Sequence, residues 1–501
     1  MYYFAKSCTY VIFLAEGSMI DQISIPGTLY SIYVIFSIIL VIRIFLDNNH
    51  PEVSFAWLMA IIFLPYIGAV IYLLGGVNWK KYKIVKQRPE ITFQKELGTI
   101  LKNQKIFMGE LSKQIDNDIA KTMVLSLQSS NAVITLNNTS EIFYSGSSFF
   151  DSFIRDLEGA TDSIHIEYYI FRDDIIGNKI SDILKRKAID GVTVRVIFDG
   201  VGCFNKMSKK FKKNLTKSGI KTKYFLDPAN VFTGRLLNYC NHRKIAVIDG
   251  NIAYTGGMNI GDEYLDGGKK FNSWRDTHIK IQGESVHMLQ SVFLSDWYNS
   301  GGENITEEGY FPEVEEVEGN LPMQIVVSGP DSDWYSLEKL FFNMIMNSNR
   351  IVYVQTPYFI PSSSLLNALE TTALSGVEVN LMITGNPDKK IPFWVAGTYF
   401  DSLLAAGVNI YLYQKGFLHS KVLIVDDTIS TVGSCNMDIR SFHLDYEVNA
   451  VYYNKKMTGA LVEQFHKDLH YCKRINIEDR KKLNILKRLR NSIFRIFSPV
   501  L

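Results

Sequence analysis

The longest apolar runs of the chain lie near its N-terminus. Residues 29–46 are apolar apart from Arg43, and residues 55–74 contain no charged side chain. A helix needs about 20 apolar residues to cross a bilayer, and a short polar turn over 47–54 joins the two runs. The pattern predicts a transmembrane helical hairpin within residues 1–79. A signal peptide fits less well, because the first run starts far in and has no basic leader; buried core helices are the other alternative.

Basic residues after the second run predict the orientation of this hairpin. They are Lys80, Lys81, Lys83, Lys86 and Arg88, whereas the turn between the runs has nearly balanced charge. By the positive-inside tendency, we expect a multi-pass protein of the cell membrane with its catalytic part in the cytoplasm. Residues 80–130 are polar, rich in Lys and Gln, and predicted to be a linker with helical patches. The apolar piece 10–15 is too short to span, which leaves the topology of residues 1–24 open.

The body of the chain repeats one order of predicted elements. Strand-like runs rich in β-branched residues occur at 163–171 and 191–200, and again at 351–360 and 376–385, with a helical segment inside each pair. Strand, helix and strand in succession predict an α/β fold with a largely parallel or mixed sheet in each copy.

We therefore expect two similar halves, residues 131–305 and 320–476, packed face to face about a pseudo-twofold. A basic amphipathic tail, 477–501, follows. Its apolar residues at helical spacing are Ile485, Leu486, Leu489, Ile493, Ile496 and Phe497, with Lys and Arg between them. This pattern fits an interfacial helix on an anionic lipid surface, and it fits equally a helix packed on the body with its basic side in solvent.

One spaced motif occurs twice, 177 positions apart. In both copies the order is His-x-Lys, then Asp, then a Gly-led turn, then Asn. The first copy is His242, Lys244, Asp249, Gly256, Gly257 and Asn259, and the second is His419, Lys421, Asp426, Gly433, Ser434 and Asn436. Agreement at this many positions argues against a chance pair of surface strand residues.

The spacing predicts how these side chains point. Each His-x-Lys opens a β-branched run, and residues two apart on a strand share a face, so His and Lys should point the same way. Asp249 and Asp426 should lie on the opposite face, where we expect them to support the turn and the next strand. The Gly residues allow the backbone to lie close to a bound phosphate. Asn259 and Asn436 can then donate hydrogen bonds to a phosphate oxygen.

Two His-Lys pairs can together form a two-base site for phosphodiester chemistry. Zinc is a weaker alternative, because the five Cys show no C-x-x-C spacing and Lys is a poor metal ligand. The sequence predicts neither a metal nor another cofactor.

The constellation resembles the phospholipase D superfamily. The resemblance implies that one His attacks phosphorus to form a phosphohistidine, while the other protonates the leaving alcohol and deprotonates the incoming one. Lys and Asn would hold the phosphate oxygens. A carboxylate orients each His in this family; Asp276 and Glu447, which lie 34 and 28 residues after their His, match those positions, and Asp445 competes with Glu447.

Composition adds limits on partners and compartment. The 501 residues are 47% hydrophobic and 21% charged, which suits a globular protein with a membrane segment. The net charge of only +2 does not favour nucleic acid as a partner. Five unpatterned Cys indicate a reducing compartment without a disulfide framework.

Sequence segments that flank the two motifs narrow the resemblance to bacterial cardiolipin synthases of the phospholipase D type. They include HIEYYIF (165–171), WRDTH (274–278), QTPYFIP (355–361) and GFLHSK (416–421). The resemblance implies a phosphatidyltransferase that acts on two membrane phosphatidylglycerols and releases cardiolipin and glycerol. By analogy with other two-copy members, His242 is the expected nucleophile.

Other classes of function stay open at this level. A hydrolytic membrane phospholipase D would use the same residues with water as the acceptor. A nuclease of the same superfamily needs no hairpin and would carry a basic stripe. A non-catalytic membrane scaffold is disfavoured because both His-Lys pairs are intact. The sequence leaves open whether the chain forms a homo-oligomer.

Overall fold

The computed structural model describes residues 27–46, 51–73, 104, 117–225, 239–305, 308–314, 316–317, 319–496 and 498. The chain forms two compact units, residues 1–78 and 79–501. Residues 1–24, the basic residues from Lys80 to Arg88, and Phe497 lie outside the described residues.

The N-terminal unit contains helices α2 (Gly27–Leu46), α3 (Pro51–Phe63) and α4 (Ile67–Ile71). The expectation of one continuous helix over 55–74 is wrong, because the chain turns between α3 and α4. Pro65 has no N–H to donate in a helix, and Tyr66 adopts φ 66°. The turn is held against α2, since the Tyr66 N–H donates to the Tyr33 hydroxyl at 3.0 Å and the two rings lie 4.1 Å apart.

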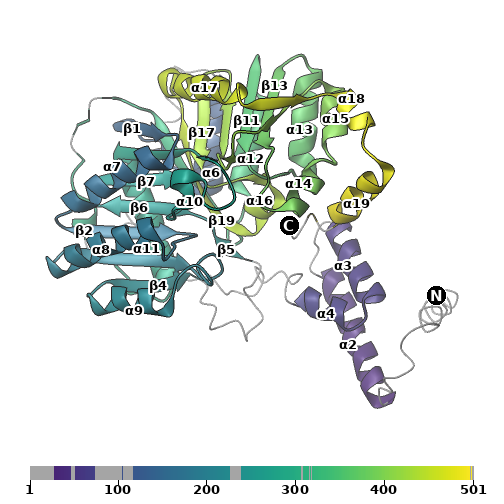
Figure 1. Ribbon diagram of the computed structural model, residues 1–501, viewed down its shortest axis with the longest axis horizontal. Helices are drawn as coiled ribbons and strands as arrows, with labels where there is room; N and C mark the ends of the chain where they lie inside the picture. Colours follow the sequence, from purple (N-terminus) through teal and green to yellow (C-terminus); the bar gives the residue numbers. More distant parts are fainter. Residues whose placement is uncertain are drawn as a thin grey trace. The chain divides into compact units, whose positions relative to one another are not determined.

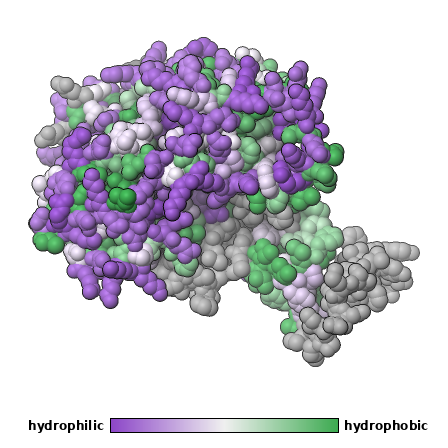
Figure 2. Space-filling model, viewed as in Figure 1, coloured by the Kyte–Doolittle hydropathy of each residue, from purple (hydrophilic) through white to green (hydrophobic). Residues whose placement is uncertain are grey.

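Among the described residues, no helix combines the length and the apolar character needed to cross a bilayer, so the two predicted spans are not confirmed. The unit is nevertheless rich in exposed apolar side chains, which gather over these helices in Figure 2. Examples are Ile35, Ile39, Phe45, Phe63 and Ile67, which are between 55% and 66% exposed.

The first half of the second unit contains a seven-stranded mixed sheet. Its strands are β1 (Asn138–Phe143), β2 (Ser163–Tyr168), β3 (Thr193–Asp199), β4 (Lys221–Phe225), β6 (Lys244–Ile248), β7 (Ile252–Gly256) and β9 (His278–Gly283), in the order β1-β9-β7-β6-β2-β3-β4. Its helices are α7 (Gly146–Gly159), α8 (Ile175–Ile189), α9 (Lys209–Lys217), α10 (Glu263–Asp266) and α11 (Ser285–Asn299).

The second half contains a corresponding sheet. Its main strands are β10 (Met323–Ser328), β11 (Ile351–Thr356), β13 (Glu378–Thr384), β14 (Asn409–Tyr413), β16 (Val422–Val425), β17 (Ile429–Gly433), β19 (Asp445–Tyr452) and β20 (Cys472–Ile475), in the order β10-β19-β17-β16-β11-β13-β14-β20. Its helices are α12 (Ser336–Met346), α13 (Ser363–Leu374), α14 (Lys390–Ala396), α15 (Phe400–Ala406), α16 (Ile439–His443) and α17 (Lys455–Leu469).

Strand by strand, the two sheets follow the same order, and β20 is an addition at one edge. In each, the predicted strand–helix–strand units form a parallel set (β2-β3-β4 and β11-β13-β14), and the motif strands β6 and β16 run antiparallel to it. The mixed α/β fold and its duplication, both expected from the sequence, are present.

One hydrophobic core joins the halves. It contains Ile245 and Ile281 from the first sheet, Ile424 and Val448 from the second, and Trp297 of α11, all nearly fully buried. Separate cores lie on the far side of each sheet, beneath α7 and α8 in one half and beneath α12 and α13 in the other. Figure 1 shows these helices on opposite sides of the body. Burying both sheets against a shared core fixes one half relative to the other.

Part of the predicted linker belongs to this body. Helix α6 (Asn117–Ser130) packs beside the second half, where the Thr122 hydroxyl lies 2.7 Å from Asn343 Oδ1 and Gln324 Nε2 donates to Met123 O at 3.2 Å. Its buried residues recur at helical spacing, which is typical of an amphipathic helix. The Lys- and Gln-rich composition around it instead favoured the prediction of a linker. The tail forms helices α18 (Ile477–Lys481) and α19 (Ile485–Arg495).

The motif aspartates lie in tight turns at the ends of their strands. Asp249 and Asp426 have φ values of 52° and 53°. The Asp249 carboxylate accepts N–H bonds from residues 161–163, the start of β2, at 2.8–2.9 Å. Asp426 accepts from residues 349–351, the start of β11, at 2.6–2.9 Å. Each carboxylate thus ties the turn after the motif strand to the neighbouring strand.

We expect Asp426→Ala to lower the free energy of unfolding by about 2–4 kcal/mol, because three backbone donors lose a charged acceptor. Asp427→Ala is a matched control. It has the same left-handed backbone, with φ 54°, but its side chain forms an exposed ion pair with Arg350, which water and salt screen. Urea unfolding of both variants makes the comparison, and equal losses would contradict this role.

Candidate active site

Two short parallel strand pairs join the halves at the motif histidines. Strand β5 (Cys240–Asn241) pairs with the start of β19, and β15 (Phe417–Leu418) pairs with β8 (Trp274–Arg275). The histidine that follows each short strand stays bonded to the other half, since His242 N–H donates to Tyr446 O at 2.9 Å and His419 N–H to Arg275 O at 2.7 Å. The main strands therefore begin after the histidines rather than at them.

The histidine–carboxylate pairs are crossed between the halves. His242 Nδ1 lies 2.9 Å from Glu447 Oε1, and His419 Nδ1 lies 2.6 Å from Asp276 Oδ2. Each carboxylate follows its own half's histidine in the sequence but contacts the histidine of the other half. Both carboxylates are fully buried. A hydrogen bond at Nδ1 fixes the ring orientation and leaves Nε2 for chemistry.

The motif lysines lie buried behind the histidines. Lys244 Nζ donates to the carbonyl of His242, and Lys421 Nζ does the same to His419. Burial lowers the pKa of Lys244 to about 7 and that of Lys421 to about 8. An added phosphate would favour the charged form of both ammonium groups.

The two carboxylates differ in charge. Burial raises the pKa of Glu447 to about 7. Burial also acts to raise the pKa of Asp276, but contact with His419 and Lys421 outweighs it and holds that pKa below its ordinary value. Asp276 is therefore ionised at neutral pH, whereas the Glu447 carboxyl holds its proton more strongly than an ordinary glutamate.

The histidines differ accordingly. Burial, with the ammonium groups of Lys244 and Lys421, holds the pKa of His242 well below its usual value. Burial and Lys421 lower the pKa of His419 to about 4, and Asp276 opposes this shift. Of the two rings, His419 has the partner better suited to stabilise an imidazolium.

The Gly257–Ser434 difference between the motif copies follows from the length of these acids. A Cβ at Gly257 would lie 2.0 Å from Asp276 Oδ1, because the shorter acid sits close to the backbone. Glu447 has one more methylene, and the corresponding space holds Ser434, whose hydroxyl donates to Glu447 Oε2. The half with Asp requires Gly, and the half with Glu has room for Ser.

The asparagines are also unequal. Asn259 is engaged internally, since its amide donates to the Tyr264 hydroxyl at 2.6 Å and its Oδ1 accepts from Ile170 N–H at 3.1 Å. Asn436 is buried, and its Oδ1 accepts no hydrogen bond from any described residue. Of the two predicted phosphate ligands, only Asn259 has its amide group engaged at both ends; to bind a phosphate oxygen, Asn436 would use its Nδ2 donors.

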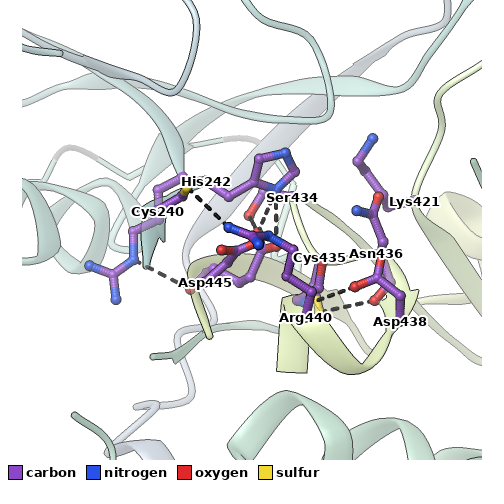
Figure 3. A network of polar contacts seen from close by, with 12 residues as sticks. Cys240, His242, Lys421, Ser434, Cys435, Asn436, Asp438, Arg440 and Asp445 are labelled. Carbon is purple, nitrogen blue, oxygen red and sulfur yellow. Dashed lines mark hydrogen bonds and ion pairs between the residues drawn. The ribbon is translucent and has the colours of Figure 1, made fainter. Parts of the chain in front are cut away.

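Both histidines and both asparagines line one cavity of about 370 Å³. The ring of Tyr169 meets His242 edge-on at 4.9 Å, and that of Trp274 lies 5.4 Å from His419. Figure 3 draws His242 of the first half together with Lys421, Ser434 and Asn436 of the second. The geometry thus brings the two predicted half-sites together.

Asp445 does not orient His242. Its Oδ2 pairs with Arg440 Nε at 3.2 Å, and Arg440 also donates to Cys240 Sγ at 3.3 Å. Burial raises the pKa of Asp445 to about 7. Its position two residues before Glu447 on β19 puts it on the same face of the strand, which is why the sequence could not separate the two candidates.

Sequence reasoning missed several residues that support the site. Arg243 pairs with buried Asp296 and lies 3.4 Å from the Glu447 carbonyl, and Arg275 pairs with buried Asp468 at 2.9 Å. Each Arg is adjacent to a site residue, which is the only signal the sequence carries. Among the described residues, no group of three or more His, Cys, Asp or Glu side chains could hold a metal ion.

Comparison with known proteins agrees with this fold. A family model described as a cardiolipin synthase, phospholipase D-like domain matches residues 153–297 and 341–469, more than half of the chain. A phospholipase D-nuclease N-terminal model matches residues 35–76. The crystal structure of phosphatidylserine synthase from Haemophilus influenzae covers 76% of this chain with a TM-score of 0.57 at 14% identity, a likeness of fold.

Curated relatives are similar over nearly the whole length. A cardiolipin synthase of Halalkalibacterium halodurans is 38% identical, covering 94% of each chain. The major cardiolipin synthase of Bacillus subtilis is 37% identical, covering 95% of this chain and all of that one. This chain therefore belongs to the cardiolipin synthase family of phospholipase D-like proteins.

The crossed pairs predict a specific difference between neighbouring acids. Glu447→Gln should lower kcat by about a hundredfold or more, because His242 loses the carboxylate that selects its tautomer. Asp445→Asn, two positions away and also buried, should lower kcat by less than about tenfold. Steady-state rates with phosphatidylglycerol, with circular dichroism to verify folding, decide between them. A reversed order of the two losses would mean that Asp445 is the orienting group.

Proposed function

We propose that this protein is a cardiolipin synthase, which transfers a phosphatidyl group from one phosphatidylglycerol to the hydroxyl of another. The single observation that supports it most is the pair of histidines on one cavity, each held by a carboxylate of the opposite half. Two bases on one cavity can cleave one phosphodiester and form another.

In the proposed first step, His242 Nε2 attacks phosphorus. The P–O bond to the glycerol headgroup breaks, His419 gives its proton to the leaving oxygen, and a phosphatidyl-histidine remains. The low pKa of His242 keeps its ring neutral and nucleophilic, while ionised Asp276 supports the charged form of His419. The bound phosphodiester anion further raises the pKa of His419 toward the protonated form.

In the proposed second step, the chemistry runs in reverse with a new alcohol. His419 accepts the proton of the second phosphatidylglycerol's hydroxyl as its oxygen attacks phosphorus. The P–N bond to His242 then breaks, and cardiolipin leaves. Lys244, Lys421 and Asn436 would bind the phosphate oxygens, and their burial strengthens each interaction with the charge that develops there. We assign Asp249 and Asp426 to the turns.

The N-terminal unit is proposed to hold the enzyme at its substrate. Exposed apolar side chains on α2, α3 and α4 fit contact with lipid, and the match of the N-terminal family model to residues 35–76 covers these helices. Membrane association places the site beside phosphatidylglycerol at the bilayer surface. The cytoplasmic location of the catalytic part stays a prediction, whereas the described helices do not support two complete spans.

Product analysis with headgroup-labelled phosphatidylglycerol tests the proposed activity. We expect cardiolipin and labelled glycerol in equal amounts, because each transfer releases one headgroup. Phosphatidic acid as the main product would replace the synthase with a hydrolytic phospholipase D, and the absence of turnover would indicate a scaffold.

The two histidines should be equally indispensable. We expect His242→Ala and His419→Ala each to lower kcat by at least about a thousandfold, since nucleophile and acid act as one unit. The variants should differ in trapping experiments. Only His419→Ala retains the proposed nucleophile. After a quench in alkaline denaturant, which spares the acid-labile P–N bond, lipid labelled in its phosphatidyl part should remain attached to that variant and not to His242→Ala. Attachment to His242→Ala alone would exchange the two roles.

A further inference from the structure

Helix α19 of the C-terminal tail packs on the catalytic body through one face. The ring of Phe494 lies 5.5 Å from Trp394 of α14, and the guanidinium of Arg490 covers the same indole at 3.8 Å. Arg495 lies over Tyr399 at 4.4 Å, and Asn491 between these contacts is buried. Stacking of cations and rings on one side gives the helix a defined orientation on the body.

The opposite face of α19 is an apolar stripe in solvent. Leu486, Leu489, Ile493 and Ile496, spaced three, four and three residues apart, are 69%, 57%, 49% and 61% exposed. Side chains at this spacing lie on one side of a helix. The stripe is therefore not the core-facing side of an amphipathic helix, because the core-facing side is the one that carries Phe494. A contiguous exposed apolar stripe marks a contact surface.

A basic cavity lies beside the stripe. It has a volume of about 190 Å³ between α15, α18 and α19, and its charged lining residues are Asp401, Arg480, Lys481 and Arg488. Arg480 pairs with Asp401 at 2.6 Å and Arg488 at 3.6 Å. Three cations around one carboxylate leave an excess of positive charge, which suits an anionic group.

The stripe and the catalytic cavity are linked through one short helix. Lys389 and Pro392, at the start of α14, line the catalytic cavity, and Trp394 of the same helix carries α19. A partner bound to the stripe is therefore held at a fixed distance from the residues that line the catalytic cavity.

We propose that α18 and α19 form a docking surface for an anionic lipid bilayer, separate from the N-terminal unit. The stripe enters the acyl boundary, and the cavity lined by Arg480, Lys481 and Arg488 takes lipid phosphate. An apolar stripe with a flanking excess of cations matches both parts of such a surface. The role in presenting the active site to lipid rests on the proposed function.

The test uses the full chain with Leu489→Gln and Ile493→Gln combined. The matched control is Ile175→Gln with Ile189→Gln, which changes two residues of α8 that are 81% and 74% exposed in the first half. Cardiolipin formation is measured on phosphatidylglycerol vesicles and in mixed micelles. We expect the stripe variant to lose at least about fivefold on vesicles and less than twofold in micelles, and the control to lose less than twofold in both. Equal rates of the stripe variant and wild type on vesicles would overturn the proposal, as would an equal loss in both settings.

The second variant pair, Lys481→Gln with Arg488→Gln, tests the cavity. We expect its rate on vesicles to depend less on salt than that of the wild type, because fewer lipid charges are neutralised. An unchanged salt dependence would remove the cavity from the docking surface.

Amide hydrogen exchange of residues 485–496 reads the contact without turnover. The proposal expects slower exchange on vesicles containing phosphatidylglycerol than on purely zwitterionic vesicles. Protection that is independent of anionic lipid would mean that the chain's own N-terminal unit or a second copy covers the stripe, and would overturn the proposal. Protection by anionic lipid in a protein that makes no cardiolipin would support the docking surface and reject only the proposed activity.

Discussion

The active site depends on one exchange between the halves of the body. Each motif histidine follows a two-residue strand that pairs with the opposite half, and each receives its carboxylate from that half. Buried charges need partners at hydrogen-bond distance, and here the partners exist only when both halves are docked. The shared hydrophobic core supplies the docking, and the crossed pairs hold the histidines at their common cavity.

The halves keep the same strand order but not the same chemistry. In one, a short acid fills the space above Gly257 and is ionised; in the other, a longer acid leaves room for Ser434 and holds its proton to about neutral pH. A nucleophile and an acid need opposite protonation states at the same pH. Burial raises the pKa of Glu447, and the contacts with His419 and Lys421 lower that of Asp276, so the two carboxylates would suit the two proposed roles.

Much of this arrangement could be predicted from the sequence. Strands β2, β3, β11 and β13 were predictable because β-branched runs recur in two matching series, and the paired motifs indicated a single site built from two copies. The crossing was not predictable. The strands β5 and β15 are two residues long, too short for any periodicity, and the distance along the chain suggested a partner within the same half. Pro65 could have predicted the break between the two helices, since proline interrupts a helix. The uninterrupted apolar residues on both sides of it instead favoured one continuous helix.

Asn259 shows another limit of sequence. Its spacing matches that of Asn436, yet its amide is occupied by Tyr264, five residues onward. A sequence motif shows which residue occupies a position, but it does not show which neighbouring groups hydrogen-bond to that residue. Tertiary contacts, not spacing, decide which of two equivalent amides remains available.

The crossed pairs also constrain how such a chain can change over generations. A substitution at Asp276 alters the surroundings of His419, 143 positions away, more than those of the histidine in its own repeat. Each repeat therefore completes a histidine pair of the other, and a change at one of these carboxylates is felt in the opposite repeat.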